Sequence, residues 1–148
     1  MYTRILLATD GAASSQLAAQ HAIALADVSG AQLLALRVVP PYASTYLDGG
    51  MALTAADIEN MEQQWKHEAM ESLLAIKSLA QRQQVRVKPL VVMADEVAST
   101  VVQVAKRHKC DLIVMASHGR RGLKRLLMGS ETQEVLALAR TPVLVVRA

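Results

Sequence analysis

Residues 111–130 read DLIVMASHGRRGLKRLLMGS, and this stretch decides the fold. It starts with a short run of mostly branched apolar residues, 111–115, which is typical of a strand buried on both faces of a parallel sheet. Glycines follow at 119 and 129, and a helical pattern begins at Ser130. Glycine lets backbone N–H groups approach an anion closely, and the first turn of a helix offers unpaired N–H groups at the positive end of its dipole. The stretch therefore predicts a strand, a phosphate-binding loop and a helix.

Strand-like and helical patterns alternate along the whole chain. Apolar runs of strand length lie at 3–9, 31–39, 85–93, 111–116 and 142–146, and helical spacing of apolar residues lies at 13–27, 54–80, 96–109 and 130–140. Pro40 and Pro41 end the second strand and open a long loop. This alternation predicts an α/β domain with a doubly wound, five-stranded parallel sheet of the Rossmann-like class. From the class we expect the strand order 3-2-1-4-5, which places the first and fourth strands side by side.

Length and composition limit the class of protein. The 148 residues contain no linker-like stretch, so we expect a single domain over 1–148. The apolar runs are far shorter than the ~18 residues of a membrane span. Only four apolar residues follow Arg4 before Thr9, too few for a secretory signal, so a cytoplasmic location is expected. The single Cys110 excludes an intramolecular disulfide, and we expect a partly buried side chain there.

The charge of the chain is modest overall but concentrated in one place. A net charge of +3, no Phe and one Trp argue against a nucleic-acid-binding surface. The segment between Gly119 and Gly129 nevertheless carries four cations, Arg120, Arg121, Lys124 and Arg125. They either form a solvated surface or neutralise a bound triphosphate, and the sequence favours neither.

Ligands of open α/β sheets bind at the carboxyl ends of the strands, and three segments occupy such positions. They are Thr9-Asp10 after the first strand, Val38 after the second, and 116–130 after the fourth. Asp10 is either a turn residue before Gly11 or a ligand contact.

The glycine loop itself contains residues with more than one possible role. Gly119 and Gly129 either contact phosphate or serve turn geometry, and Ser130 has the spacing to Gln133 that would let it cap its helix. His118 beside Ser117 suggests a nucleophile and base, but adjacent side chains in a loop do not normally converge, so a role in loop geometry is expected.

Taken together, these residues resemble the universal stress protein family. Its nucleotide-binding members carry Gly, two residues, Gly, nine residues, and then Gly-Ser or Gly-Thr. The resemblance also covers Thr9-Asp10, the loop after Val38, the strand 111–115 and the terminal stretch 141–146, so it spans nearly the whole chain. Here the first motif glycine is Ala116, and Glu131 follows Gly-Ser where the family usually has a small or apolar residue.

The resemblance implies a binding site for ATP on a fold like that of the adenine nucleotide α-hydrolases. Asp10 and the backbone of Val38 would lie near adenine and ribose, while Gly119, Gly129, Ser130 and nearby N–H groups would hold phosphates. A Mg²⁺ ion belongs to this expectation only because triphosphates usually carry one. The residues expected at the site are Ala8, Thr9, Asp10, Val38, Met115, Ala116, Gly119, Arg120, Gly129, Ser130, Glu131 and Thr132.

The resemblance also implies a homodimer, and the last strand supplies a physical reason. In the expected order, 143–146 is an edge strand with apolar residues on both faces, and an exposed edge of this kind invites aggregation. Pairing with its symmetry mate across a two-fold axis would remove that edge.

The leading hypothesis is a stress regulator that binds ATP and acts through binding, without fast catalysis. The first alternative is a nucleotide-free dimeric interaction module of the same family, which Ala116 and Glu131 favour. The second is a slow ATPase. Against it count the lack of a Gly-x-x-x-x-Gly-Lys loop and the lack of a placed general base, so we do not expect an enzyme.

Overall fold

In the computed structural model, which describes residues 1–45, 53–118 and 128–147, strands and helices alternate as expected. The strands are β1 (Arg4–Ala8), β2 (Gln32–Val39), β3 (Val87–Met93), β4 (Leu112–Ala116) and β5 (Val143–Val146). The helices are α1 (Ala13–Ser29), α2 (Tyr42–Thr45), α3 (Ala55–Gln81), α4 (Val97–Arg107) and α5 (Ser130–Leu138). The strands form a parallel sheet in the order β3-β2-β1-β4-β5. The predicted fold class and strand order are therefore confirmed.

β1 lies at the centre of the sheet, and its side chains alternate between two hydrophobic layers. Leu6 is in register with Leu34 of β2 and Ile113 of β4, and all three side chains are buried. Ile5 and Leu7 belong to the layer on the opposite face. Because both faces are covered, a central strand must be apolar at every position, which explains the continuous runs in the sequence.

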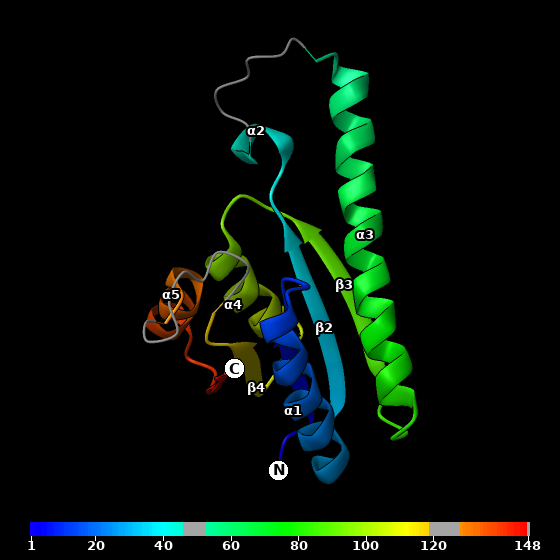
Figure 1. Cartoon of the computed structure of the whole chain (residues 1–148). Coiled ribbons are helices and arrows are strands. Elements are labelled where there is room, and N and C mark those ends of the chain that lie inside the picture. The colour runs from blue at the N-terminus through cyan, green and yellow to red at the C-terminus, as the bar shows by residue number, and fades with distance from the viewer. Residues whose placement is uncertain (46–52, 119–127, 148) are drawn as a thin grey trace.

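Helices cover the two faces in pairs (Figure 1). α1 and α3 pack against one face, where α1 contributes Ile23 and α3 contributes Leu73. α4 and α5 cover the other face, to which they contribute Val101 and Val135. Because all the strands are parallel, the loops that follow them lie at one edge of the sheet, the edge at which a ligand is expected.

Two helix ends are set by local sequence. α1 ends at Gly30, whose φ of 68° lies in the left-handed region that favours glycine, and its N–H group bonds back to the carbonyls of Ala26 and Asp27. α3 begins with a capping box: Thr54 Oγ1 accepts from the Asp57 N–H group at 3.1 Å, and Asp57 Oδ2 accepts from the Thr54 N–H group at 3.2 Å.

The short helix α2 lies within the segment predicted to be loop. It is held by contacts with α3, which are remote in sequence. The Tyr42 N–H group donates to Glu62 at 2.9 Å, and the Tyr42 ring stacks on Trp65 with ring centroids 6.4 Å apart. A single turn of helix stabilised by tertiary contacts leaves no periodic signal in its own residues, so the sequence did not predict it.

Cys110 follows α4 and is buried, with 7% of its surface exposed. Burial raises the pKa of its thiol to about 11, so the side chain is a small, unreactive part of the core. Among the helices that the structure describes, none combines the length and hydropathy that a bilayer span requires.

Candidate functional site

The carboxyl ends of β1 and β4 lie side by side, so the turn after β1 meets the segment after β4. Ala8 is the register partner of Met115. Just beyond, the Ser14 hydroxyl at the start of α1 donates to the His118 carbonyl at 2.9 Å. Ser14 is not among the site residues that the sequence predicts. Its one signal was a serine in the first turn of the helix that follows Asp10 and Gly11.

The turn between β1 and α1 is fixed by its own polar side chains. The Thr9 hydroxyl donates to Ser15 Oγ at 2.9 Å and accepts from the Gly11 N–H group at 3.2 Å. Asp10 Oδ1 accepts from the Ala12 N–H group at 2.9 Å. Asp10 therefore has the predicted turn role, since its side chain shapes the backbone two residues on. Its contact with a ligand stays a prediction.

The start of α5 is tied to the end of β4 by two hydrogen bonds. The Gly129 N–H group donates to the Ser117 carbonyl at 2.7 Å. The Thr132 hydroxyl, on a side chain that is 3% exposed, donates to the Ala116 carbonyl at 3.0 Å. These bonds aim the N-terminus of α5, with its positive dipole end, at the same edge of the sheet where β1 ends.

The predicted capping role of Ser130 is wrong, because Ser130 is the first helical residue of α5 and the residue before it is the N-cap. Gly129 is the N-cap, and its carbonyl accepts from the Gln133 N–H group at 3.0 Å. The Gln133 side-chain amide turns back to the Met128 carbonyl at 2.7 Å. Ser130 is thus the first helical residue, with an exposed side chain, and the N-cap provides no side-chain acceptor for the first turn.

The expectation that Ser117 and His118 do not converge is also wrong. Ser117 Oγ and His118 Nδ1 lie 3.0 Å apart and form a hydrogen bond. Ser117 is buried, with 4% of its surface exposed. His118 Nε2 is buried and has no hydrogen-bond partner among the residues that the structure describes. The two side chains are thus in direct contact, and their role in loop geometry stays a prediction.

Three apolar residues of the predicted site share one face of the sheet, the face covered by α4 and α5. Ala8 and Val38 are half-buried, and Met115 is buried. Val38 lies two residues beyond Leu36, the register partner of Ala8, so β2 projects past the end of β1. The structure thus brings these side chains to the same edge.

Some of the remaining predicted site residues lie among the residues that the structure describes, and others lie outside them. Ala116 is buried at the end of β4, and Glu131 is exposed in the first turn of α5. Gly119 and the predicted cations of the loop lie outside the described residues; these cations are Arg120, Arg121, Lys124 and Arg125.

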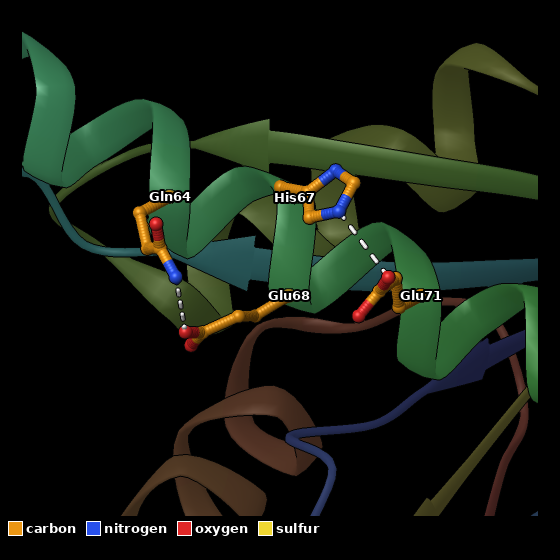
Figure 2. Close-up of polar contacts among 4 residues, drawn as sticks. All are labelled: Gln64, His67, Glu68 and Glu71. Atoms are coloured by element: carbon orange, nitrogen blue, oxygen red, sulfur yellow. Dashed lines mark hydrogen bonds and ion pairs between the residues drawn. The ribbon is translucent and has the colours of Figure 1, made fainter.

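Two histidines lie on the helices α1 and α3. His21 Nδ1 lies 3.0 Å from the Leu17 carbonyl one turn earlier in α1. His67 and Glu71 form an exposed pair on α3 with 3.2 Å between Nε2 and Oε1, beside a Gln64–Glu68 hydrogen bond of the same spacing (Figure 2). Exposed pairs of this kind contribute at most a few tenths of a kcal/mol, about 0.2–0.5, to helix stability.

Comparison with known proteins gives a consistent result along the whole chain. Residues 1–147 match the model of the universal stress protein family. A universal stress protein of Methanocaldococcus jannaschii is 33% identical over 149 residues, which cover 99% of this chain and 83% of that protein.

Solved structures agree with this match. The structure of a second M. jannaschii universal stress protein superposes with a TM-score of 0.85 at 26% identity, covering 100% of this chain and 97% of the other. A universal stress protein solved in complex with cAMP shares the fold, with a TM-score of 0.71 at 23% identity and coverage of 98% and 97%.

Proposed function

The chain belongs to the universal stress protein family, and on that premise we propose that it binds an adenine nucleotide, ATP, where β1 and β4 end, and that it acts through this binding. The observation that carries the proposal is the hydrogen-bonded junction of three segments at this edge. Ser14 links α1 to the segment after β4, while Gly129 and Thr132 link α5 to the end of β4. The fold of a universal stress protein that is solved with cAMP, an adenine nucleotide, supports the same ligand class.

The phosphates are assigned to the N-terminus of α5. Gly129 precedes the first turn of α5 and carries no side chain, so an anion can closely approach the backbone N–H groups of that turn. The Ser130 hydroxyl is exposed beside them. We assign Gly119 and Arg120 to the same subsite on the strength of the sequence motif. Mg²⁺ would arrive bound to the triphosphate.

The adenine and ribose are assigned to the β1 and β2 side of the edge. Ala8, Val38 and Met115 offer apolar surface on one face, and Thr9 and Asp10 follow directly in the turn after β1. A pocket with apolar walls and few polar groups is typical of sites for small organic ligands.

One observation favours the alternative of a nucleotide-free interaction module. Glu131 places a carboxylate in the first turn of α5, where it competes with a phosphate for the same positive dipole end. Hydrolysis is not part of the proposal, since Ser117, the hydroxyl next to an imidazole, is buried.

Substitution of Gly129 by valine tests the phosphate subsite. Its φ of −59° and ψ of 150° are open to any residue, so the variant should fold, with the new side chain in the path of the phosphates. We expect at least a roughly tenfold loss of Mg-ATP affinity, about 1.4 kcal/mol, in calorimetric titrations. Leu138→Val, at an exposed position on the far end of α5, is the matched control.

Analysis of the wild-type protein tests whether the chain binds a nucleotide at all. After mild purification, acid release and mass spectrometry should identify a bound adenine nucleotide. Protein that is empty and also fails to bind added ATP with Mg²⁺ would favour the nucleotide-free module. If the wild type binds and Gly129→Val binds equally well, the phosphates lie elsewhere.

We also propose a homodimer that pairs β5 with its copy across a two-fold axis. β5 is at the edge of the sheet and pairs with β4 alone among the described strands. Val143, Leu144 and Val145 are only half-buried within the chain. A second copy of β5 would satisfy the open edge and cover these side chains.

Val145→Lys tests the dimer interface without disturbing the hydrophobic core of the monomer. Leu144 packs against the core on the α1 face and Val143 packs on the other, whereas Val145 belongs to neither cluster, so lysine at 145 should leave the core intact. We expect the variant to be monomeric in light scattering at concentrations where the wild type is a dimer. Leu138→Lys is the control for added surface charge, and an unchanged dimer in Val145→Lys would contradict pairing through β5.

A further inference from the structure

A small basic cavity lies at the opposite edge of the sheet, where the strands begin. Its volume is about 110 Å³, and its lining residues are Arg4, Gln32, Leu34, Lys88 and His108. At ~30 Å³ per water molecule, the space holds roughly three to four waters. It is therefore much smaller than the roughly 300–1,000 Å³ of a site for a nucleotide-sized ligand.

The strand register brings the polar side chains of this cavity together. Arg4 of β1 is in register with Gln32 of β2, and Leu34 of β2 is in register with Lys88 of β3. Because successive side chains of a strand point to opposite faces, these four side chains all lie on the face of the sheet that α4 covers. His108, the C-cap of α4, closes the cavity above them. Three neighbouring strands and one helix end thus each contribute a polar group to one small space.

The charge around this cavity is positive and largely unbalanced. Neither Arg4 nor Lys88 forms an ion pair with another described residue. Asp111, the acidic neighbour, already accepts from the Thr3 N–H group, the Thr3 hydroxyl and the Arg4 N–H group. Burial lowers the pKa of His108, and the positive charges of Lys88, Arg4 and Arg107 lower the pKa further.

The C-terminal end of α4 carries the negative end of a helix dipole, which by itself disfavours an anion. Arg4 offsets this effect, because its guanidinium donates to the His108 carbonyl, the C-cap carbonyl of the helix. The same hydrogen bond holds the guanidinium in place beside the cavity. Its remaining N–H groups form no hydrogen bond to another described residue.

We propose that this cavity binds a tetrahedral oxyanion, the phosphate group of inorganic phosphate or of a phosphomonoester, between Arg4, Lys88 and His108. The Gln32 amide is the neutral hydrogen-bond donor of the site. The anion supplies the negative charge that the cations lack. This cavity lies where the strands begin, whereas the proposed nucleotide site lies where β1 and β4 end. The two sites are therefore separated by the length of the strands.

The test measures the protonation of His108 in the full chain by NMR of the histidine ring nitrogens. Sulfate is the probe, because its charge stays constant through the titration, and chloride at equal ionic strength is the reference salt. We expect sulfate to raise the pKa of His108 by about one unit, which corresponds to roughly tenfold tighter binding to the protonated ring. The ring signals of His21 and His67, on exposed helix surfaces, are the internal reference.

Two substitutions of equal charge test whether the cavity itself is responsible. Lys88→Gln removes a lining cation, and Lys106→Gln removes an exposed cation of α4 that does not line the cavity. Both side chains are exposed, so both variants should fold. The sulfate effect should largely disappear in Lys88→Gln and persist in Lys106→Gln. Equal behaviour of the two variants, or a His108 titration that is the same in sulfate and chloride, would overturn the proposal.

A last arm separates the two sources of the phosphate group. Inorganic phosphate and phenyl phosphate are each added at fixed pH while the His108 ring signals are followed. A response to both supports a site open to phosphomonoesters, and a response to inorganic phosphate alone supports a site for the free ion. A response to neither overturns the proposal. None of these results depends on whether the chain binds a nucleotide.

Discussion

Replacement of Leu6 by alanine should lower the free energy of unfolding by about 3 kcal/mol, within the range of about 2–5 kcal/mol for leucine-to-alanine changes in protein cores. Leu6 is 0% exposed and lies between its register partners Leu34 and Ile113. Because β1 is central, neither neighbouring strand can move inward to fill the space without breaking its own pairing. The substitution thus loses buried apolar surface and also leaves a cavity.

Urea denaturation followed by circular dichroism measures this effect. Leu138→Ala on α5, where 53% of the side chain surface is exposed, is the matched control and should change stability by less than about 0.5 kcal/mol. A loss below about 1 kcal/mol for Leu6→Ala would show that the layer under α4 repacks, contrary to the rigid central strand described above.

Asp111→Ala should destabilise the protein by about 2 kcal/mol at neutral pH. The Asp111 carboxylate accepts at 2.8 Å from the Thr3 N–H group, at 2.9 Å from the Thr3 hydroxyl and at 3.3 Å from the Arg4 N–H group. These bonds attach the start of β1 to the start of β4. The two bonds from Thr3 are exposed and the bond from Arg4 is partly buried, so we assign about 0.5–1 kcal/mol to each bond.

The effect of Asp111 should depend on pH in a defined direction. Burial tends to raise the pKa of this carboxyl, but the hydrogen bonds from Thr3 and Arg4 outweigh it and hold the pKa below its ordinary value of 3.8. A lowered pKa in the folded state means that the stabilisation is present above the ordinary value and is lost as the pH falls through the folded-state pKa.

The stability difference between the wild type and Asp111→Ala should therefore be constant near neutrality and shrink below about pH 4. Asp111→Asn keeps one oxygen acceptor but not the charge. Its free energy of unfolding at pH 7 should lie between those of the wild type and Asp111→Ala, and its difference from Asp111→Ala should lack this pH dependence. A difference that stays the same down to pH 2 would show that the carboxylate acts through side-chain packing alone.

The fold could be predicted because its determinants are local. The run 111–116 has no polar residue after Asp111, and such a short, mostly branched run is typical of a strand covered on both faces. Gly30 and Thr54 mark helix ends through their own backbone and side-chain chemistry. The strand order followed from the α/β class, in which connections of these lengths restrict the arrangements that a parallel sheet can adopt.

The candidate site was predicted less completely, since its geometry depends on contacts between segments. The start of α5 is set by the bond from Gly129 to Ser117, so Ser130 lost the capping position that its spacing to Gln133 suggested. The convergence of Ser117 and His118 depends on a backbone conformation that no periodic pattern encodes. The basic cavity was missed for the same reason: Arg4, Gln32 and Lys88 meet only through strand register.

The burial of Cys110 has a practical consequence for the experiments above. At pH 7 a thiol with a pKa of about 11 is a thiolate in about one molecule in ten thousand, so maleimide reagents should leave it unmodified. Cys110 is the single cysteine of the chain. A cysteine introduced at an exposed position such as Val28, where 86% of the surface is accessible, would accept a fluorophore selectively. Site-specific labels for binding and assembly can thus be attached while the native cysteine stays in place.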